Sequence, residues 1–141
     1  MFFLQKSLCF IICLLWFSLG FAGINNPLII NFSKTQYGAA NKNWSISEDE
    51  HGILYFGNDI GLLEFDGIEW KLNKLPKAEV VRSVYAVSNN EIYTGGYEEF
   101  GKWSRQPDGE LTYTSLSKEL PTDNWQNDDI WRILPQGESI Y

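Results

Sequence analysis

The sequence predicts an all-β chain built from repeated four-stranded antiparallel units. Short runs rich in β-branched and aromatic residues alternate with Asn, Asp and Gly residues, and the same order of parts recurs along the chain. After residue 22, no segment has the sustained apolar spacing of three and four residues that indicates a helix. Residues 115–120 could hold one helical turn.

Two complete units and the start of a third can be aligned. The expected strands of the first unit are residues 44–49, 53–57, 61–65 and 68–70. Those of the second unit are residues 82–87, 92–96, 100–103 and 111–113, and the third unit begins with residues 130–134 and 140–141. The Asn, Asp and Gly residues between the strands tolerate the positive φ that tight hairpins need.

Equivalent residues recur within these units. Tyr55, Tyr93 and Tyr141 are spaced 38 and 48 residues apart. Gly57 and Gly95 each follow a tyrosine-containing strand, where a side chain would obstruct a bulge or the close approach of a neighbouring strand.

Four strands per unit at a period of roughly 40–50 residues are typical of β-propeller blades. We therefore expect a partial β-propeller, with two blades and the start of a third, after an N-terminal signal peptide. The expected divisions are a signal peptide at 1–22, a linker or closing segment at 23–43, blades at 44–80 and 81–129, and a truncated blade at 130–141. A ring needs about four to eight blades, so we expect a fragment of a longer protein. A β-sandwich with two accidentally similar hairpins is the alternative.

The first 22 residues have the pattern of a secretory signal. Lys6 precedes an apolar run that ends at the small-residue site Gly20-Phe21-Ala22, and cleavage is expected after Ala22. A retained membrane anchor is the alternative. Both cysteines, Cys9 and Cys13, lie in this run, so the mature chain would have no disulfide and no thiolate metal site.

The net negative charge of the chain argues against nucleic acid as a partner. Without Lys6, the mature chain has 10 basic and 18 acidic residues, giving 10 − 18 = −8. Such a surface repels phosphate backbones, so no nucleic acid is expected to bind this segment. No metal or cofactor is expected either.

Five residues are candidates for ligand binding. Trp44, Arg82 and Arg132 are assigned to similar places at the starts of the three units, which in a propeller lie near the mouth of the central channel. A guanidinium there could bind a carboxylate or sulfate, although a structural pair with an acid of a neighbouring blade is the competing interpretation. Trp125 and Trp131 flank amides and carboxylates, an arrangement that can stack on a sugar and bind its hydroxyls.

No residue is assigned a catalytic role. The only histidine, His51, lies in an expected turn beside Gly52, where an exposed loop residue is the simplest interpretation. The acidic pairs Glu98-Glu99 and Asp128-Asp129 do not fit the oxygen spacing of a calcium loop and are expected in solvated loops.

Residues 46–62 resemble the two-component regulator propeller repeat. They contain its acidic turn from Asp49 to Gly52, its aromatic strand ending in Gly57, and its Gly61-Leu62 step. Residues 63–67, 81–84, 92–96 and 99–101 add to the likeness, whereas Asn89-Asn90 departs from the turn pattern. Together they look like the opening blades of exported regulators that have a triple-tyrosine domain after the propeller.

The resemblance implies a location and a role. In such proteins the propeller lies on the periplasmic face of the bacterial inner membrane, followed by a transmembrane helix and a histidine kinase or DNA-binding output. We therefore expect an extracytoplasmic sensing segment that binds a small molecule, with a carbohydrate as one candidate, and acts through later domains. It would meet the membrane only through the signal peptide or those later regions. The alternatives are a fragment of a propeller-fold carbohydrate-active enzyme or lyase, and a purely protein-binding propeller.

Overall fold

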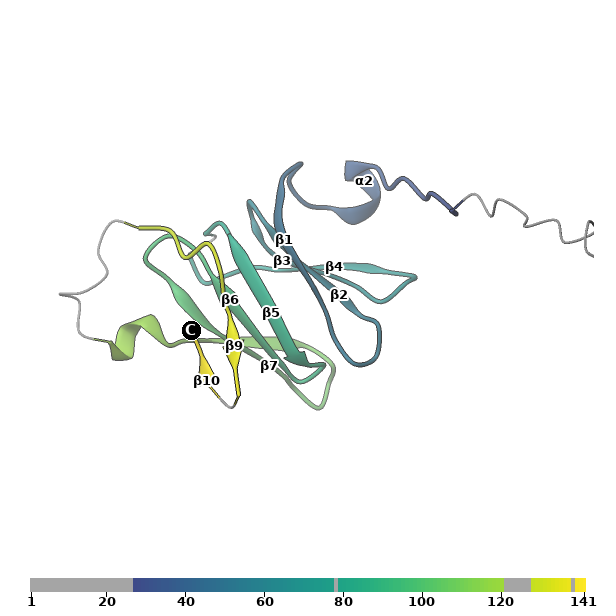
Figure 1. The fold of residues 1–141 in the computed structure, drawn as a ribbon. Helices are drawn as coiled ribbons and strands as arrows, with labels where there is room; N and C mark the ends of the chain where they lie inside the picture. Colours follow the sequence, from purple (N-terminus) through teal and green to yellow (C-terminus); the bar gives the residue numbers. More distant parts are fainter. Residues whose placement is uncertain (1–26, 78, 121–127, 138) are drawn as a thin grey trace, which may run out of the picture. The chain divides into compact units, whose positions relative to one another are not determined.

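The computed structural model describes residues 27–77, 79–120, 128–137 and 139–141, and Figure 1 shows their β-strands. Residues 32–141 form one compact unit, and residues 27–31 belong to a separate N-terminal unit. The expected signal peptide at 1–22 lies outside the described residues. Within the described ranges, no helix is long and apolar enough to cross a membrane.

Two four-stranded antiparallel sheets follow one another in the chain, each with its strands in sequential order. Sheet 1 consists of β1 (Asn43–Glu48), β2 (Leu54–Asn58), β3 (Gly61–Phe65) and β4 (Trp70–Asn73). Sheet 2 consists of β5 (Ser83–Ser88), β6 (Glu91–Gly95), β7 (Phe100–Arg105) and β8 (Leu111–Ser115). These eight strands confirm the all-β class and the repeated four-stranded unit.

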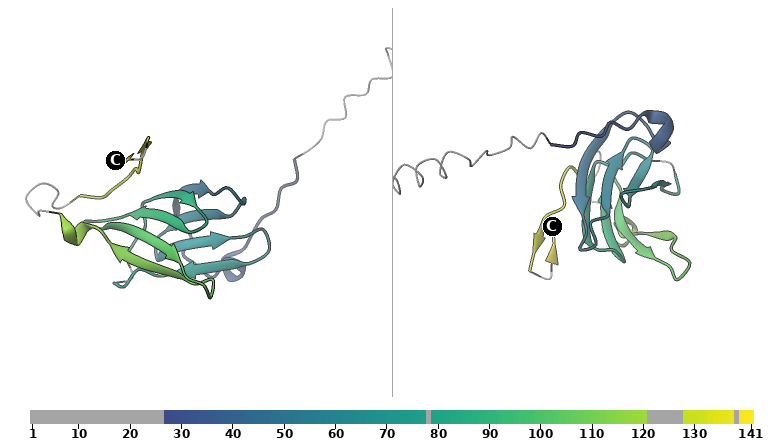
Figure 2. Two further views of the ribbon diagram at one scale, coloured as in Figure 1. Left: turned by 90° about the horizontal axis from the view of Figure 1, so that it is seen from below. Right: turned by 90° about the vertical axis from the view of Figure 1, so that its right-hand side faces the viewer.

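The two sheets pack face to face, as the views in Figure 2 show. Their side chains form one core between them, made of Tyr55, Leu62, Leu75, Val81, Val84, Ala86, Ile92 and Trp103. The first strands also meet directly, because the Ala86 N–H donates to Ser47 Oγ at 2.9 Å. Alternation along the strands thus places one face of each sheet in a shared interior.

A polar network crosses the same interface. The Arg105 guanidinium donates from Nη2 to Glu64 Oε1 at 2.7 Å and to the Tyr55 hydroxyl at 3.1 Å. Its Nε donates to Asn89 Oδ1 at 2.7 Å, and Nη1 donates to the Gly109 carbonyl at 2.9 Å. We call the pair of Arg105 and Glu64 the inter-sheet clamp.

The two sheets are equivalent in register as well as in topology. In sheet 1, Ser45 lies opposite Gly57, and in sheet 2, Ser83 lies opposite Gly95. A Cβ built on Gly57 would lie 2.8 Å from the carbonyl oxygen of Val81. The equivalent atom on Gly95 would lie 2.6 Å from Ile130 Cγ2, so the segment after each sheet approaches it at the same glycine.

The outer face of sheet 1, turned away from sheet 2, has an aromatic cluster. Trp70 stacks on Phe65 with ring centroids 4.3 Å apart and lies 5.5 Å from Phe56. Phe32 and Tyr37 add edge and tilted contacts to Trp70 at 5.1 and 5.8 Å.

Tyr37 lies on a short helix that the sequence pattern does not indicate. α2 (Lys34–Tyr37) begins after Ser33, whose N–H donates to the Gln36 side chain at 2.7 Å. It ends at Gly38, which has the left-handed φ of 64° typical of a helix C-terminus. Four residues are too few to show helical periodicity, so only the capping residues could have indicated it.

The third unit differs from the expectation of a strand at residues 130–134. These residues form no ladder; Asp129 makes an isolated bridge with Tyr97, and the Ile130 N–H donates to the Gly96 carbonyl at 2.9 Å. A two-stranded hairpin follows, made of β9 (Pro135–Gln136) and β10 (Ser139–Ile140). The segment is therefore held by the end of sheet 2 rather than by a strand of its own. The helical turn expected within 115–120 is present as the 3-10 helix η1 (Ser117–Glu119).

Candidate ligand-binding site

Three of the five predicted ligand-binding residues lie together. The Arg82 guanidinium carbon is 4.0 Å from the centroid of the Trp44 ring and 5.2 Å from that of Trp131. The two indoles meet edge to face, with centroids 6.0 Å apart. We call these three residues the Trp–Arg cluster. Both distances fit cation–π attraction, so the cation contacts two aromatic rings.

The fold positions the cluster through its repeated units. Trp44 precedes Ser45 in β1, and Arg82 directly precedes Ser83, the equivalent residue at the start of β5. Trp131 follows Ile130 just as Arg82 follows Val81. The three side chains therefore occupy one equivalent position in three successive units.

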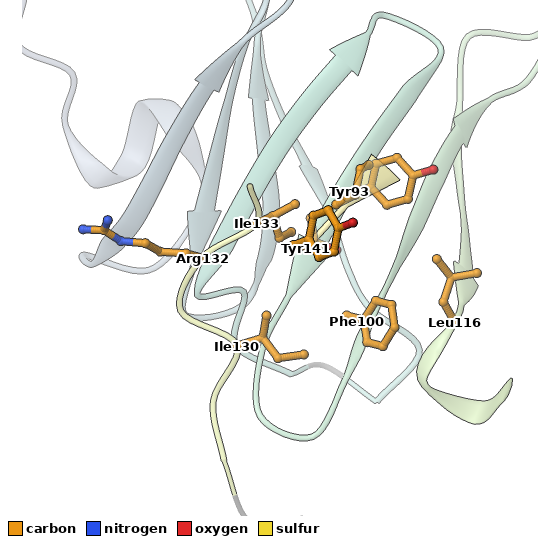
Figure 3. Close-up of a pocket in the computed structure, with 9 residues that line it drawn as sticks. Tyr93, Phe100, Leu116, Ile130, Arg132, Ile133 and Tyr141 are labelled. Atoms are coloured by element: carbon orange, nitrogen blue, oxygen red, sulfur yellow. The ribbon is translucent and has the colours of Figure 1, made fainter. Parts of the chain in front are cut away.

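This geometry corrects the assignment of Arg132. The internal repeat predicts Arg132 in the position equivalent to Arg82, but the contact of Ile130 with Gly95 puts Trp131 there instead. Figure 3 shows the Arg132 side chain extending away from the other labelled residues. Trp125, the fifth candidate, lies outside the described residues.

Two acids hold the cluster in place. Arg82 Nε donates to Asp129 Oδ1 at 3.2 Å, and Trp44 Nε1 donates to Asp59 Oδ1 at 2.7 Å. The Arg82 and Asp129 side chains are only 19% and 21% exposed. The competing interpretation, a structural arginine paired with an acid, is therefore correct for Nε. Asp59 was not predicted, because it lies 15 residues from Trp44 in a turn with no pattern of its own.

One donor of the guanidinium is left over. Arg82 Nη1 is buried and has no hydrogen-bond partner in the described part of the chain. A buried, unpaired donor on a charged group is costly. The two indoles keep outer surface, with Trp44 39% exposed and Trp131 55% exposed. The cluster thus combines exposed aromatic surface with a cation whose hydrogen bonding is incomplete.

A cavity of about 390 Å³ lies on the outer face of sheet 2, the face turned away from sheet 1 (Figure 3). It is bounded by that sheet on one side and by the segment after Asp129 on the other. Its lining residues are Tyr93, Thr94, Phe100, Leu116, Ile130, Arg132, Ile133, Ile140 and Tyr141. The lining is mainly aliphatic and aromatic.

The turn containing His51 is held by local hydrogen bonds. Asp49, Glu50 and His51 offer ligand atoms within 4.8 Å of one another. However, Asp49 Oδ1 accepts the His51 and Ile53 N–H groups, and Oδ2 accepts the Tyr55 hydroxyl. Asp49 therefore orders the turn, a role that its place in the acidic turn motif explains.

The acidic pairs also have structural contacts. Glu99 accepts a hydrogen bond from the Tyr113 hydroxyl at 2.8 Å, and the Glu98 N–H donates to the Asp128 carbonyl at 3.0 Å. The first contact connects the turn after β6 to β8, and the second connects it to the segment just before the third unit.

Comparison of the chain with protein-family models, with curated proteins and with solved structures gave no match.

Proposed function

We propose that the two sheets are consecutive blades of a β-propeller and that this propeller is the extracytoplasmic ligand-sensing part of a bacterial signalling protein. The shared topology and register of the sheets support the architecture. The recurrence of the Val81 contact at Ile130 also supports it, because each blade would then meet the next at the same glycine. The signalling role rests on the resemblance to the two-component regulator propeller repeat.

The observation that carries ligand binding is the unpaired Nη1 of Arg82 within the Trp–Arg cluster. An anion that moves Trp131 aside would reach this donor and form a charge-assisted hydrogen bond. The exposed face of Trp44 would pack against an apolar ring face of the same ligand. A sugar acid or sulfated sugar combines both features, so this is the ligand class that we propose.

The position of the cluster provides a route from binding to signal. Its three residues come from three successive units, so a ligand that pairs with Arg82 and displaces Trp131 favours one arrangement of those units. A ligand shifts such an equilibrium only by its difference in affinity for the two arrangements. Displacement of Trp131 would supply that difference in affinity. The later domains would respond to the changed balance between the two arrangements.

Titration of the full chain with D-glucuronate, with D-glucose as the uncharged partner, tests this proposal. We expect glucuronate to change the tryptophan fluorescence and glucose to have a much weaker effect, because only the acid can pair with Arg82. Arg82→Gln should weaken the glucuronate response by about tenfold or more. The matched control is Arg132→Gln, which removes a guanidinium outside the cluster and should retain the response.

Two results would contradict the proposal. One is an equal response to both sugars, and the other is an equal loss in the Arg82 and Arg132 variants. Thermal melting of each variant separates a lost contact from a lost fold.

A further inference from the structure

The walls of the cavity on sheet 2 repeat the wall that sheet 1 presents to the core. Tyr93 and Phe100 occupy the places of Tyr55 and Leu62, as the pairing of Gly57 with Leu62 and of Gly95 with Phe100 shows. Ile130 takes the place of Val81 against the glycine. The outer face of sheet 2 is therefore a second copy of a surface that sheet 1 buries.

The first interface shows what fills such a space. Sheet 2 contributes Val84, Ile92 and Trp103 to the core, and Trp103 is only 2% exposed. In the third unit, Ile133 follows Ile130 at the spacing at which Val84 follows Val81. Ile140 lies opposite Pro135 as Ile92 lies opposite Ala86. No described residue of the third unit occupies the position equivalent to Trp103. The cavity lies on the face of sheet 2 that such a residue would cover.

We propose that β10 and the outer face of sheet 2 accept a further antiparallel strand, which inserts an indole-sized aromatic side chain into the cavity. The strand would pair with β10 as β7 pairs with β6, placing the aromatic residue opposite Ile140 as Trp103 lies opposite Ile92. The occupant is a strand of a further repeat unit that has the residue pattern of β7. The inference rests on the repeat architecture of the proposed function and not on ligand sensing.

The backbone of β10 is ready for such pairing. Leu134 and Tyr141 exchange both backbone hydrogen bonds, at 2.6 and 2.9 Å. In an antiparallel ladder the next residue, Ile140, then directs its N–H and C=O to the opposite edge. Within the described ranges, β9 is the only strand paired with β10. Its other edge can therefore receive a strand.

The charge of Lys102 on the outer face of sheet 2 predicts a second residue type in the incoming strand. In the first interface, Arg105 lies two residues after Trp103 and pairs with Glu64. Lys102 occupies the place of Glu64 in sheet 2, because it pairs with Tyr93 as Glu64 pairs with Tyr55. An arginine at the incoming position would meet a like charge, so an acidic residue is expected two positions after the aromatic one.

Peptides with the sequence of residues 100–115, which form β7 and β8, provide the probe. The test peptide has Arg105→Glu and 5-fluorotryptophan at position 103, and fluorine NMR reports its binding to the full chain. The matched control peptide has Trp103→Ala, and its binding is measured by calorimetry. We expect the test peptide to bind at least about tenfold more tightly than this control. It should also bind more tightly than the peptide that keeps Arg105.

A charge exchange in the full chain is the control. Lys102→Glu should reverse the preference, so that the peptide with Arg105 becomes the tighter ligand, and Lys102→Met should abolish the preference. Equal binding of the Trp and Ala peptides, absence of binding, or a preference that survives Lys102→Glu would each overturn the inference. Glucuronate titration of the same samples measures ligand binding at the Trp–Arg cluster. Failure of ligand sensing and failure of strand addition are thereby distinguished.

Discussion

At the scale of single residues, glycines fix how closely the repeated units approach. Gly57 was predicted to permit a close approach, and the structure gives its cause: a Cβ there would lie 2.7 Å from Ser45 Oγ and 2.8 Å from the Val81 carbonyl oxygen. The one-residue error at Arg132 has a related origin. No ladder anchors residues 130–134, and only the contact of Ile130 with Gly95, which sequence alone does not reveal, sets their register.

Gly57→Ala should destabilise the fold by about 1–3 kcal/mol, because the Val81 backbone and the Ser45 side chain must move to admit the methyl group. Urea unfolding followed by circular dichroism measures this difference. The exposed Thr112→Ala in β8 is the control and should stay within about 0.5 kcal/mol of the parent chain. A Gly57 variant as stable as this control would show that the close approach is not required.

At the scale of elements, the strands and turns of the two sheets follow from the sequence. Alternation and the Asn, Asp and Gly turns place all eight strands to within a few residues. The inter-sheet clamp does not follow, because Arg105 and Glu64 lie 41 residues apart and meet only once the sheets have packed. No local pattern distinguishes either residue from an exposed charge on a strand.

Arg105→Met should lower the free energy of unfolding by about 3–5 kcal/mol, because it leaves the buried Glu64 carboxylate without its cation. The double variant with Glu64→Leu should recover part of this loss, since both charges are then absent. Lys71→Met provides the comparison: Lys71 pairs with Glu110 on the exposed surface and should cost less than about 1 kcal/mol. A double variant no more stable than Arg105→Met would contradict this account of the clamp.

At the scale of the whole molecule, the repeat in the sequence predicts two successive sheets but not the contacts that join them. Trp44 and Arg82 could be proposed as partners because they are assigned to unit starts. Their acids, Asp59 and Asp129, could not, because each depends on where a loop ends after packing. Trp131 was proposed only as a sugar-stacking residue with Trp125, and its contact with Arg82 follows from packing. The cavity on sheet 2 was not predicted for the same reason. Sequence periodicity therefore identifies the units, and three-dimensional packing identifies their interfaces.

Tyrosines at these interfaces should make the whole fold sensitive to alkaline pH. A hydrogen bond to the Glu91 carboxylate, followed by burial, raises the pKa of Tyr93 from 10.0 to about 12. Burial raises the pKa of Tyr55, partly opposed by its hydrogen bond from Arg105. Burial and then the hydrogen bond to Glu99 raise the pKa of Tyr113. In all three, the fold favours the neutral phenol.

The sign of the pH effect follows from linkage. In the unfolded chain these phenols ionise near pH 10.0, whereas in the folded chain they keep their protons to higher pH. Their contribution to stability is therefore complete below pH 10 and is lost as pH rises through the folded pKa, about 12 for Tyr93. Urea unfolding at successive pH values should show stability falling across this window. Tyr55→Phe and Tyr113→Phe should each reduce the slope and Thr112→Ala should retain it, whereas an unchanged slope in both Phe variants would mean that the interface tyrosines do not govern the alkaline transition.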